Sequence, residues 1–377
     1  MTTQSTSDND FLVYNDFFDG SNDDIHSMIL DGSNRYIQKV SGNGLNIDNS
    51  ILNSIANNNS IYIENGYLKN SPVLSNLYYF DENHIIRSIN DVYDFFDKLV
   101  SEFPFYVNRV DRGVDALGNH IYEYAFTPPP KRVQGVAISY SLPTKITIMA
   151  GIHGSERAAI INLMIFCYNL CHNPNGLENY SKIRSSMQLI VVPAINPSGV
   201  NSRNRVNSNG VDLNRNFPTE WSNADGSKGD SPLSELESRI ALDIFNAHPD
   251  SLCNLSLHGH GLEKQLFWMG SHKEWTLRLS NKVLNEVLAF YHDQMPFDTD
   301  KSLTLNYLSN NTAGTLDRHL QIGLNKSSIL LEFSGVNELL GNNIVCSRVL
   351  GEVMLKKTIF EILETHQQSL ILKSFTN

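Results

Sequence analysis

The 377-residue sequence has few cysteines and no excess of positive charge. Lysine and arginine together number 29 against 40 aspartates and glutamates, which gives a formal net charge of −11. This balance argues against nucleic acid or an anionic membrane as a partner, because binding either would require a basic surface. The four cysteines are too few for a disulfide framework, and we expect Cys167 and Cys171 to be buried thiols in a helix.

Long apolar runs are lacking as well. No segment approaches the roughly 18 apolar residues of a membrane-spanning helix, so we expect no membrane partner. The first residues, MTTQSTSDNDFLVY, have neither the basic start nor the apolar centre of a signal peptide, which predicts a cytoplasmic location. Hydrophobic residues make up 41% and charged residues 18%, as in ordinary globular proteins.

The composition of the chain changes close to residue 87. Residues 1–86 are rich in Asn, Ser, Asp and Gly, and SIYIENGYLKN contains a hairpin signal at Asn65-Gly66, so we predict a small β-rich accessory domain. The following segment INDVYDFFDKLVSEF has helical spacing of apolar residues, with Asn90 as the expected cap. We therefore place the main domain at residues 87–377.

Within the main domain, apolar strand-like runs alternate with helical patterns. The strand-like runs are KITIMAG, MQLIVVPAIN, CNLSLHG and SSILLEF, and each is followed by an amphipathic or apolar helical segment. This alternation predicts an α/β fold with a mixed, mainly parallel central sheet flanked by helices on both faces.

Polar residues of the types used in catalysis end or follow each of these four runs. They are His153 and Glu156, then Asn196, then His258, then Glu332. Ligands of open α/β sheets gather beyond the carboxyl ends of the strands, so we expect these residues to meet in one crevice.

Two histidines and a glutamate in this set fit a metal site. His153 and Glu156 lie across a strand-to-helix turn, in which Gly151 and Gly154 allow a sharp bend, and His258 supplies a third ligand. Two His and one Glu with an open fourth position are typical of one catalytic zinc ion per chain. A capped helix start is the structural alternative for the His153–Glu156 pair, because a carboxylate is favoured in a first helical turn.

Glu332 follows an apolar run that reads as fully buried. A carboxylate there is costly unless a cation or a function compensates, so a core salt bridge and a catalytic base are the two interpretations. As a base it would take a proton from a zinc-activated water and deliver it to the leaving amine.

The segment NPSGVNSRNRVNSNGVDLNRNFP reads as a polar loop that is rich in arginine and amide side chains. It is either a solvated surface or a site at which guanidinium groups of Arg203, Arg205 and Arg215 bind a substrate carboxylate or a charge developing on a carbonyl.

From Ile89 to the C-terminus, the chain resembles the zinc metallocarboxypeptidases, the carboxypeptidase A-like family. The motifs that carry the resemblance are INDVYDFFDKLVSEFP, RVDRGVDALGNHIYEYAF, GIHGSE, NPSG, GVDLNRNFP, SLHG and LLEFSG. The resemblance implies zinc binding by His153, Glu156 and His258, and Glu332 as the base. It further implies a peptide or small amide substrate with a free C-terminal carboxylate, and leaves the oligomeric state open.

The resemblance also assigns roles to the polar loop. Asp212 matches the carboxylate that orients a liganding histidine, and Asn214 with Arg215 matches the pair that binds the terminal carboxylate of the substrate. Arg205 best matches the arginine that stabilises the oxyanion, with Arg203 as the neighbouring alternative.

Three features bear on the subfamily. The segment RVNSNGVDLNRNFP and the SELE helix start are most similar to bacterial murein-peptide amidases, which cleave γ-D-glutamyl-diaminopimelate bonds. Asn310 stands where the family often has a tyrosine, and Tyr307 would replace it only after a loop shift. Leu316, at the position that often tunes side-chain preference, indicates an uncharged pocket.

Two other functions are compatible with these motifs. The aspartoacylase-like zinc deacylases of N-acyl amino acids share an HGxE motif and a DLNR-like motif, although the opening from Ile89 favours a carboxypeptidase. A binding protein that keeps the fold without activity is the second alternative, and Asn310 leaves it open.

Overall fold

The protein is described from a computed structural model. The described residues are 25–30, 35–40, 76–78, 82–128, 132–133, 136–137, 143–172, 179–260, 265–270, 274–294, 304–309, 312–334 and 343–376.

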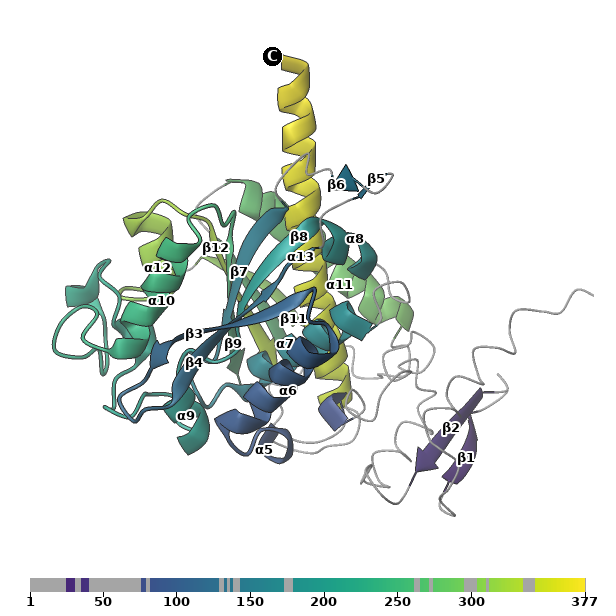
Figure 1. The fold of residues 1–377 in the computed structure, drawn as a ribbon, viewed down its shortest axis with the longest axis horizontal. Coiled ribbons are helices and arrows are strands. Elements are labelled where there is room, and N and C mark those ends of the chain that lie inside the picture. The colour runs from purple at the N-terminus through teal and green to yellow at the C-terminus, as the bar shows by residue number, and fades with distance from the viewer. Residues whose placement is uncertain are drawn as a thin grey trace, which may run out of the picture.

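An eight-stranded sheet forms the centre of the molecule, with the strand order β11-β10-β12-β9-β7-β8-β4-β3 (Figure 1). Four neighbouring pairs are parallel and three are antiparallel. The predicted mixed, mainly parallel sheet is therefore confirmed. Its strands are β3 (Val107–Val114), β4 (His120–Phe126), β7 (Thr144–Ala150), β8 (Met187–Val192), β9 (Asn254–His260), β10 (Gln265–Gly270), β11 (Thr304–Ser309) and β12 (Ser328–Ser334).

Alternate side chains of the strands supply two separate cores, one on each face of the sheet. In β7, Ile146 and Ile148 belong to the larger core, whereas Met149 belongs to the smaller one. In β8 the same alternation separates Val191 from Ile190. Successive side chains of a strand point to opposite faces, so this apolar sequence is buried on both sides.

Helices cover both faces, as the alternating pattern predicts. The larger core is covered by α6 (Ile89–Glu102), α7 (Arg157–His172), α8 (Tyr180–Ser186), α11 (Glu274–Gln294) and α13 (Asn343–Thr376). The smaller core is covered by α10 (Leu236–Ala247) and α12 (Leu316–Arg318), which continues into η3 (His319–Gly323). Among the helices that the structure describes, we find none with the length and apolarity that crossing a bilayer requires.

Short elements lie between these helices and strands in the described part of the chain. They are α5 (Glu82–Ile85), α9 (Pro197–Ser202), η1 (Leu213–Arg215), η2 (Trp221–Asn223) and the two-residue strands β5 (Arg132–Val133) and β6 (Val136–Ala137).

The start of α6 differs from the prediction, which named Asn90 as the cap. The helix begins at Ile89 and its N-cap is Ser88. The carboxylate of Asp91 accepts the backbone N–H groups of Arg87 and Ser88, both at 2.8–2.9 Å. Asp91 lies three residues after Ser88, as in a capping box. Its carboxylate binds the backbone N–H group of Ser88, so the helix begins before Asn90.

Among the described residues of the N-terminal region, β1 (Ile25–Leu30) pairs antiparallel with β2 (Arg35–Val40). The hairpin predicted at Asn65-Gly66 lies outside the described residues. Leu77, Tyr78 and Ile86 are buried in the larger core together with α6 and α7. The division into residues 1–86 and 87–377 remains a prediction, but part of the first segment packs with the main domain.

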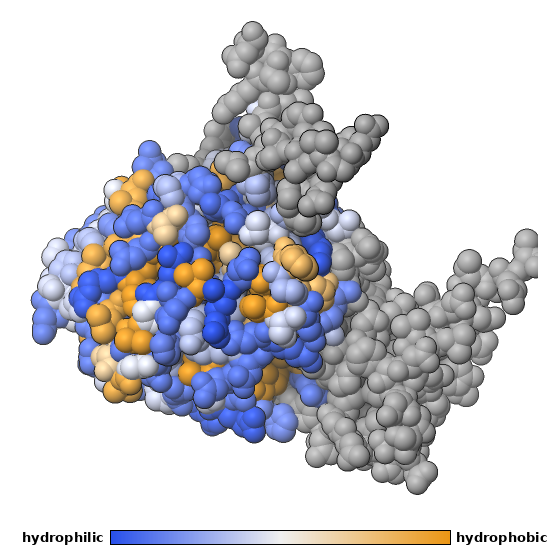
Figure 2. All heavy atoms as spheres, in the orientation of Figure 1, coloured by the Kyte–Doolittle hydropathy of each residue, from blue (hydrophilic) through white to orange (hydrophobic). Residues whose placement is uncertain are grey.

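Apolar residues are scattered over the surface. Figure 2 shows hydrophilic and hydrophobic residues interspersed on one face of the molecule. Among the described residues, Phe105 and Leu117 are the most exposed large apolar side chains, at 93% and 70%. Scattered residues of this kind are normal and indicate no docking surface by themselves. Within the protein, Cys167 and Cys171 are buried free thiols, as predicted.

Candidate active site

The predicted polar residues meet at one edge of the sheet. Strands β12, β9, β7 and β8 are neighbours in that order and run parallel, so their carboxyl ends lie together. His153 and Glu156 follow β7, His258 lies in β9 and Glu332 lies in β12. The structure therefore brings His153, Glu156 and His258 together at this edge of the sheet, with Glu332 beside His258.

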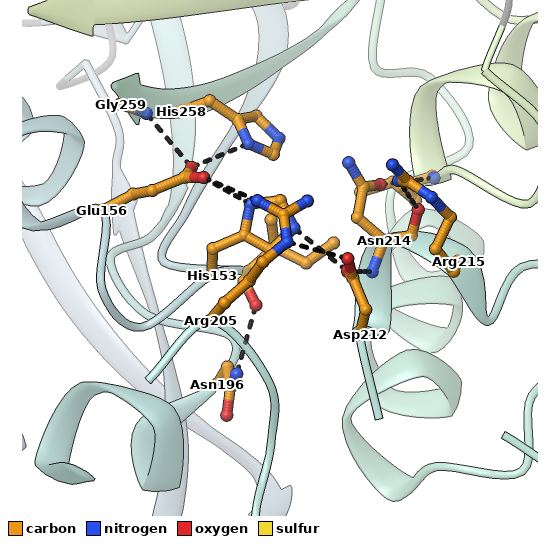
Figure 3. A network of polar contacts seen from close by, with 11 residues as sticks. His153, Glu156, Asn196, Arg205, Asp212, Asn214, Arg215, His258 and Gly259 are labelled. Carbon is orange, nitrogen blue, oxygen red and sulfur yellow. Dashed lines mark hydrogen bonds and ion pairs between the residues drawn. The ribbon is translucent and has the colours of Figure 1, made fainter. Parts of the chain in front are cut away.

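Glu156 lies between the two histidines, with one carboxylate oxygen facing each ring (Figure 3). Nδ1 of His153 is 2.7 Å from Oε1, and Nδ1 of His258 is 2.9 Å from Oε2. One ligand atom from each of the three residues lies within 4.8 Å of the others. Both histidine side chains are almost fully buried. Two imidazole nitrogens and a carboxylate that converge in this way can bind a divalent metal ion.

The turn that carries His153 and Glu156 requires glycine. Gly151 has a φ of +66°, and a Cβ there would lie 3.0 Å from the backbone of Ala194. Gly154 packs against Gly199, and an added Cβ would lie 1.9 Å from its carbonyl carbon. The turn after β7 therefore packs directly on α9, the helix with which the polar loop begins.

Asn196 contributes to this packing rather than to the chemistry. Its side chain accepts the N–H of Gly199 at 2.9 Å and donates to the carbonyl of Ile152 at 3.2 Å. It is the N-cap of α9 and is fully buried. Asn196 thus connects the metal-binding turn with α9.

Asp212 and Arg205 of the polar loop contact the candidate ligands His153 and Glu156. Oδ1 of Asp212 lies 3.1 Å from Nε2 of His153 and also accepts the N–H of Asn214. Oδ2 accepts Nε of Arg205 at 2.9 Å, and NH1 of Arg205 lies 3.2 Å from Oε1 of Glu156. When Asp212 accepts Nε2–H of His153, the lone pair of Nδ1 is left on the side of Glu156. A metal ion requires a histidine in this tautomer.

The charges of the cluster depend on one another. Burial alone would raise the pKa of Glu156, but the charges and hydrogen bonds of His258 and His153 outweigh it and hold the pKa well below its ordinary value. Burial would also lower the pKa of His258, but Glu156 and neighbouring carboxylates raise it to about 9. The site therefore favours positive charge next to Glu156, whether from protons or from a cation.

Glu332 is directly opposite His258 in the parallel pairing of β12 with β9. Its side chain is partly buried. Burial raises its pKa above the ordinary value, and His258 lowers it only in part. A carboxylate with a raised pKa beside a candidate metal ligand is suited to accept and return a proton.

Asn214 and Arg215 lie beside each other in η1, across His153 from Glu156 (Figure 3). The side-chain carbonyl of Asn214 accepts the N–H of Leu316 at 3.0 Å, which fixes its orientation. NH1 of Arg215 donates to the backbone carbonyl of Asn214 at 2.7 Å. Leu316 is buried at the start of α12, where Gly314 with a φ of +70° turns the chain toward η1.

The remaining predicted residues lie farther from this cluster or outside it. Arg203 is the exposed C-cap of α9, with a φ of 56°, and the ion pairs recorded to Glu156 and Asp212 come from Arg205. Tyr307 lies on β11, paired with Trp268 of β10. Asn310 lies outside the described residues.

The sequence interpretation did not include Gly259. Its backbone N–H donates to Oε2 of Glu156 at 3.1 Å and so fixes the carboxylate between the two rings. Nothing in a single sequence marks a backbone donor of this kind.

The sequence profile of the zinc carboxypeptidase family matches residues 92–325. The chain belongs to this family. Carboxypeptidase A1 of Sus scrofa is 23% identical over 196 residues, which cover 46% of this chain and 44% of that protein. The match thus spans less than half of the length of this curated relative.

Several solved structures share the fold. Bovine thrombin-activatable fibrinolysis inhibitor in complex with tick carboxypeptidase inhibitor has a TM-score of 0.57 at 17% identity, covering 74% of this chain and 97% of that chain. Carboxypeptidase A from Helicoverpa armigera has a TM-score of 0.55 at 17% identity, with 87% and 81% covered. A metallo-carboxypeptidase from Burkholderia cenocepacia has a TM-score of 0.53 at 18% identity, with 72% and 68% covered.

The donor set fits the metal that the family name implies. Zinc binds imidazole nitrogen and carboxylate oxygen, and catalytic zinc sites have three protein ligands with a fourth position left for water or substrate. His153, Glu156 and His258 provide such a set.

Proposed function

We propose that this zinc carboxypeptidase family member is an active metallopeptidase that hydrolyses an amide bond near a free C-terminal carboxylate. The observation that carries the proposal is the convergence of His153, Glu156 and His258 beside Glu332. In this proposal the first three residues bind one zinc ion and Glu332 is the catalytic base.

Zinc at this position would polarise the scissile carbonyl and make a nearby water more acidic. Glu332 accepts a proton from the attacking water and donates it to the nitrogen of the leaving amine, so that the proton is transferred once in each direction. The raised pKa of Glu332 supports this role, because a base with a very low pKa would accept the proton poorly.

Arg205 is the residue that we assign to the negative charge that develops on the carbonyl oxygen. Its side chain is 45% exposed, so a substrate can approach the guanidinium group. Asp212 and Glu156 hold the guanidinium group next to the metal ligands. A preorganised cation at this position stabilises an oxyanion without reorganisation.

Asn214 and Arg215 are the proposed binding site of the substrate's terminal carboxylate, with Arg203 as an additional cation at the rim. The hydrogen bond from the backbone of Leu316 fixes the side-chain amide of Asn214. The guanidinium group of Arg215 can bind a carboxylate in bidentate geometry. Binding the terminus there would set which amide bond reaches Glu332.

The substrate itself is a finer proposal. Leu316 supports an uncharged side-chain pocket, and the RVNSNGVDLNRNFP and SELE segments support a murein-type peptide. Both rest on the sequence motifs.

Metal content measured together with hydrolysis tests the proposed function. The substrate panel contains peptides with a free C-terminus, a γ-glutamyl-diaminopimelate peptide and N-acyl amino acids, assayed with wild type, His153→Ala and Glu332→Gln. We expect about one zinc per chain, loss of metal in His153→Ala, and metal without activity in Glu332→Gln. Turnover of N-acyl amino acids alone would indicate a deacylase, and metal without any turnover would indicate an inactive binding protein.

A further inference from the structure

A buried polar surface extends along the sheet beneath the candidate metal site. Strand β9 directs Asn254, Ser256 and His258 to one face, and β12 directs Ser328 and Glu332 to the same face in register. The alternate residues of these strands, Leu255, Leu257, Ile329 and Leu331, belong to the apolar core on the other face. Apart from Leu330, this face of the strand pair is therefore polar although it is buried.

Asp317 of α12 projects into this polar surface. Its side chain is completely buried. Oδ1 accepts a hydrogen bond from the hydroxyl of Ser328, whose oxygen in turn accepts Nδ2 of Asn254 at 2.9 Å. Burial raises the pKa of this carboxyl group and the hydroxyl of Ser256, a further neighbour, lowers it in part, but among the described residues no partner lies within hydrogen-bond distance of Oδ2. A buried carboxylate oxygen without a partner is costly, so its retention needs a reason.

His258 has a buried ring nitrogen, Nε2, that could donate to the Asp317 carboxylate. Its Nδ1 faces Glu156, so its Nε2 points away from the metal position (Figure 3). Nε2 is buried and has no hydrogen-bond partner among the described residues either. Both groups belong to the same buried face, and Ser256, which hydrogen-bonds toward the Asp317 carboxylate, lies two residues before His258 on β9.

We propose that Asp317 is a positioning residue for His258. Its carboxylate stabilises the form of the imidazole that carries a proton on Nε2, through a buried bridging water between Nε2–H and Oδ2. This form would leave the Nδ1 lone pair free to bind a metal ion. The inference rests on the proposed metal site and extends it, because each liganding histidine then has its own carboxylate, Asp212 for His153 and Asp317 for His258.

A purely structural role is the competing explanation. Asp317 also connects α12 to β12 through Ser328, and this bond could be its whole contribution. The two explanations differ in what removal of Ser328 does. The hydrogen bond between α12 and β12 is lost in Ser328→Ala, but the amide oxygen in Asp317→Asn can still accept it. The carboxylate next to His258 is lost only in Asp317→Asn.

The test is zinc affinity of the full chain, measured by competition with a chelating dye, for wild type, Asp317→Asn and Ser328→Ala. Loss of a partner of a liganding histidine typically weakens metal binding by about 10–100-fold, so we expect this effect in Asp317→Asn. We expect Ser328→Ala to stay within about twofold of wild type, because it keeps the carboxylate. The visible spectrum of the cobalt-substituted protein should change in Asp317→Asn alone.

Two results would overturn the proposal: unchanged affinity in Asp317→Asn, or an equal loss in both variants. If Asp317→Asn does not fold, the zinc-loaded wild type decides by NMR. The Nε2 proton of His258 should then be protected from exchange with solvent, and rapid exchange would count against Asp317. If wild type binds no zinc, the proposed function itself fails and this inference fails with it.

Discussion

Glu332 on β12 lies opposite His258 on β9 in an unbroken parallel register. Side chains at paired positions of neighbouring strands point to the same face, so the candidate base and a candidate ligand are held side by side by the sheet. Main-chain pairing, rather than a flexible loop, thus determines their separation.

Replacing Glu332 by Gln should abolish catalysis without removing the metal. The amide has nearly the same shape but does not accept a proton, and loss of a general base lowers kcat/KM by about 10²–10⁴-fold. Steady-state kinetics and metal analysis on the same sample measure both effects. Wild-type activity in Glu332→Gln would exclude this residue as the base.

Replacing Asp212 by Asn should weaken zinc binding by about 10–100-fold, because His153 would lose the carboxylate that accepts its Nε2–H. Arg205 would also lose its partner at Oδ2, so activity should fall by more than metal binding does. Dye competition and kinetics at saturating zinc separate these effects. Equal zinc affinity in variant and wild type would contradict the assigned role.

Gly154→Ala should destabilise the protein strongly. The new Cβ would lie 1.9 Å from the backbone of Gly199, and overpacking of a rigid site costs about 1–3 kcal/mol or more. Gly259→Ala is the matched control, because the nearest atoms to its Cβ lie at 3.5 Å. Urea unfolding of the metal-free variants should show a large decrease for the first and little change for the second.

Glu123 should make stability depend on pH. The Glu123 side chain is 1% exposed, and it pairs with Arg112 and His248. Burial would raise its pKa, but the hydrogen bonds from His248 and Arg112 outweigh burial and lower the pKa below 4.5.

Because the folded-state pKa is lowered, the contribution of Glu123 is present above pH 4.5 and decreases as the pH falls through the folded-state pKa. Glu123→Gln should cost about 1–3 kcal/mol at pH 7, since its partners lose a charged acceptor. Urea unfolding at pH 7 and pH 4 should show a smaller difference between variant and wild type at the lower pH. A difference that grows on acidification would refute this assignment.

Much of the site could be read from the sequence because its features are local. The period of two in NLSLH places His258 on a polar face, and the apolar run before Glu332 marks a buried strand that ends in a carboxylate. Gly151 and Gly154 beside His153 indicate a sharp turn. Such patterns depend on backbone geometry over a few residues, so they predicted the α/β class, which the structure confirms, and the ligand set and the base that we propose.

Other features depended on the tertiary structure. Of the two arginines in SRNR, Arg205 contacts Glu156, because the packing of Gly154 on Gly199 fixes how the polar loop meets the turn after β7. Asp317 shares a buried surface with His258 although 59 residues separate them, since α12 covers that face of the sheet. Sequence periodicity defines which face of a strand is polar, but only the packing of distant elements decides which groups meet there.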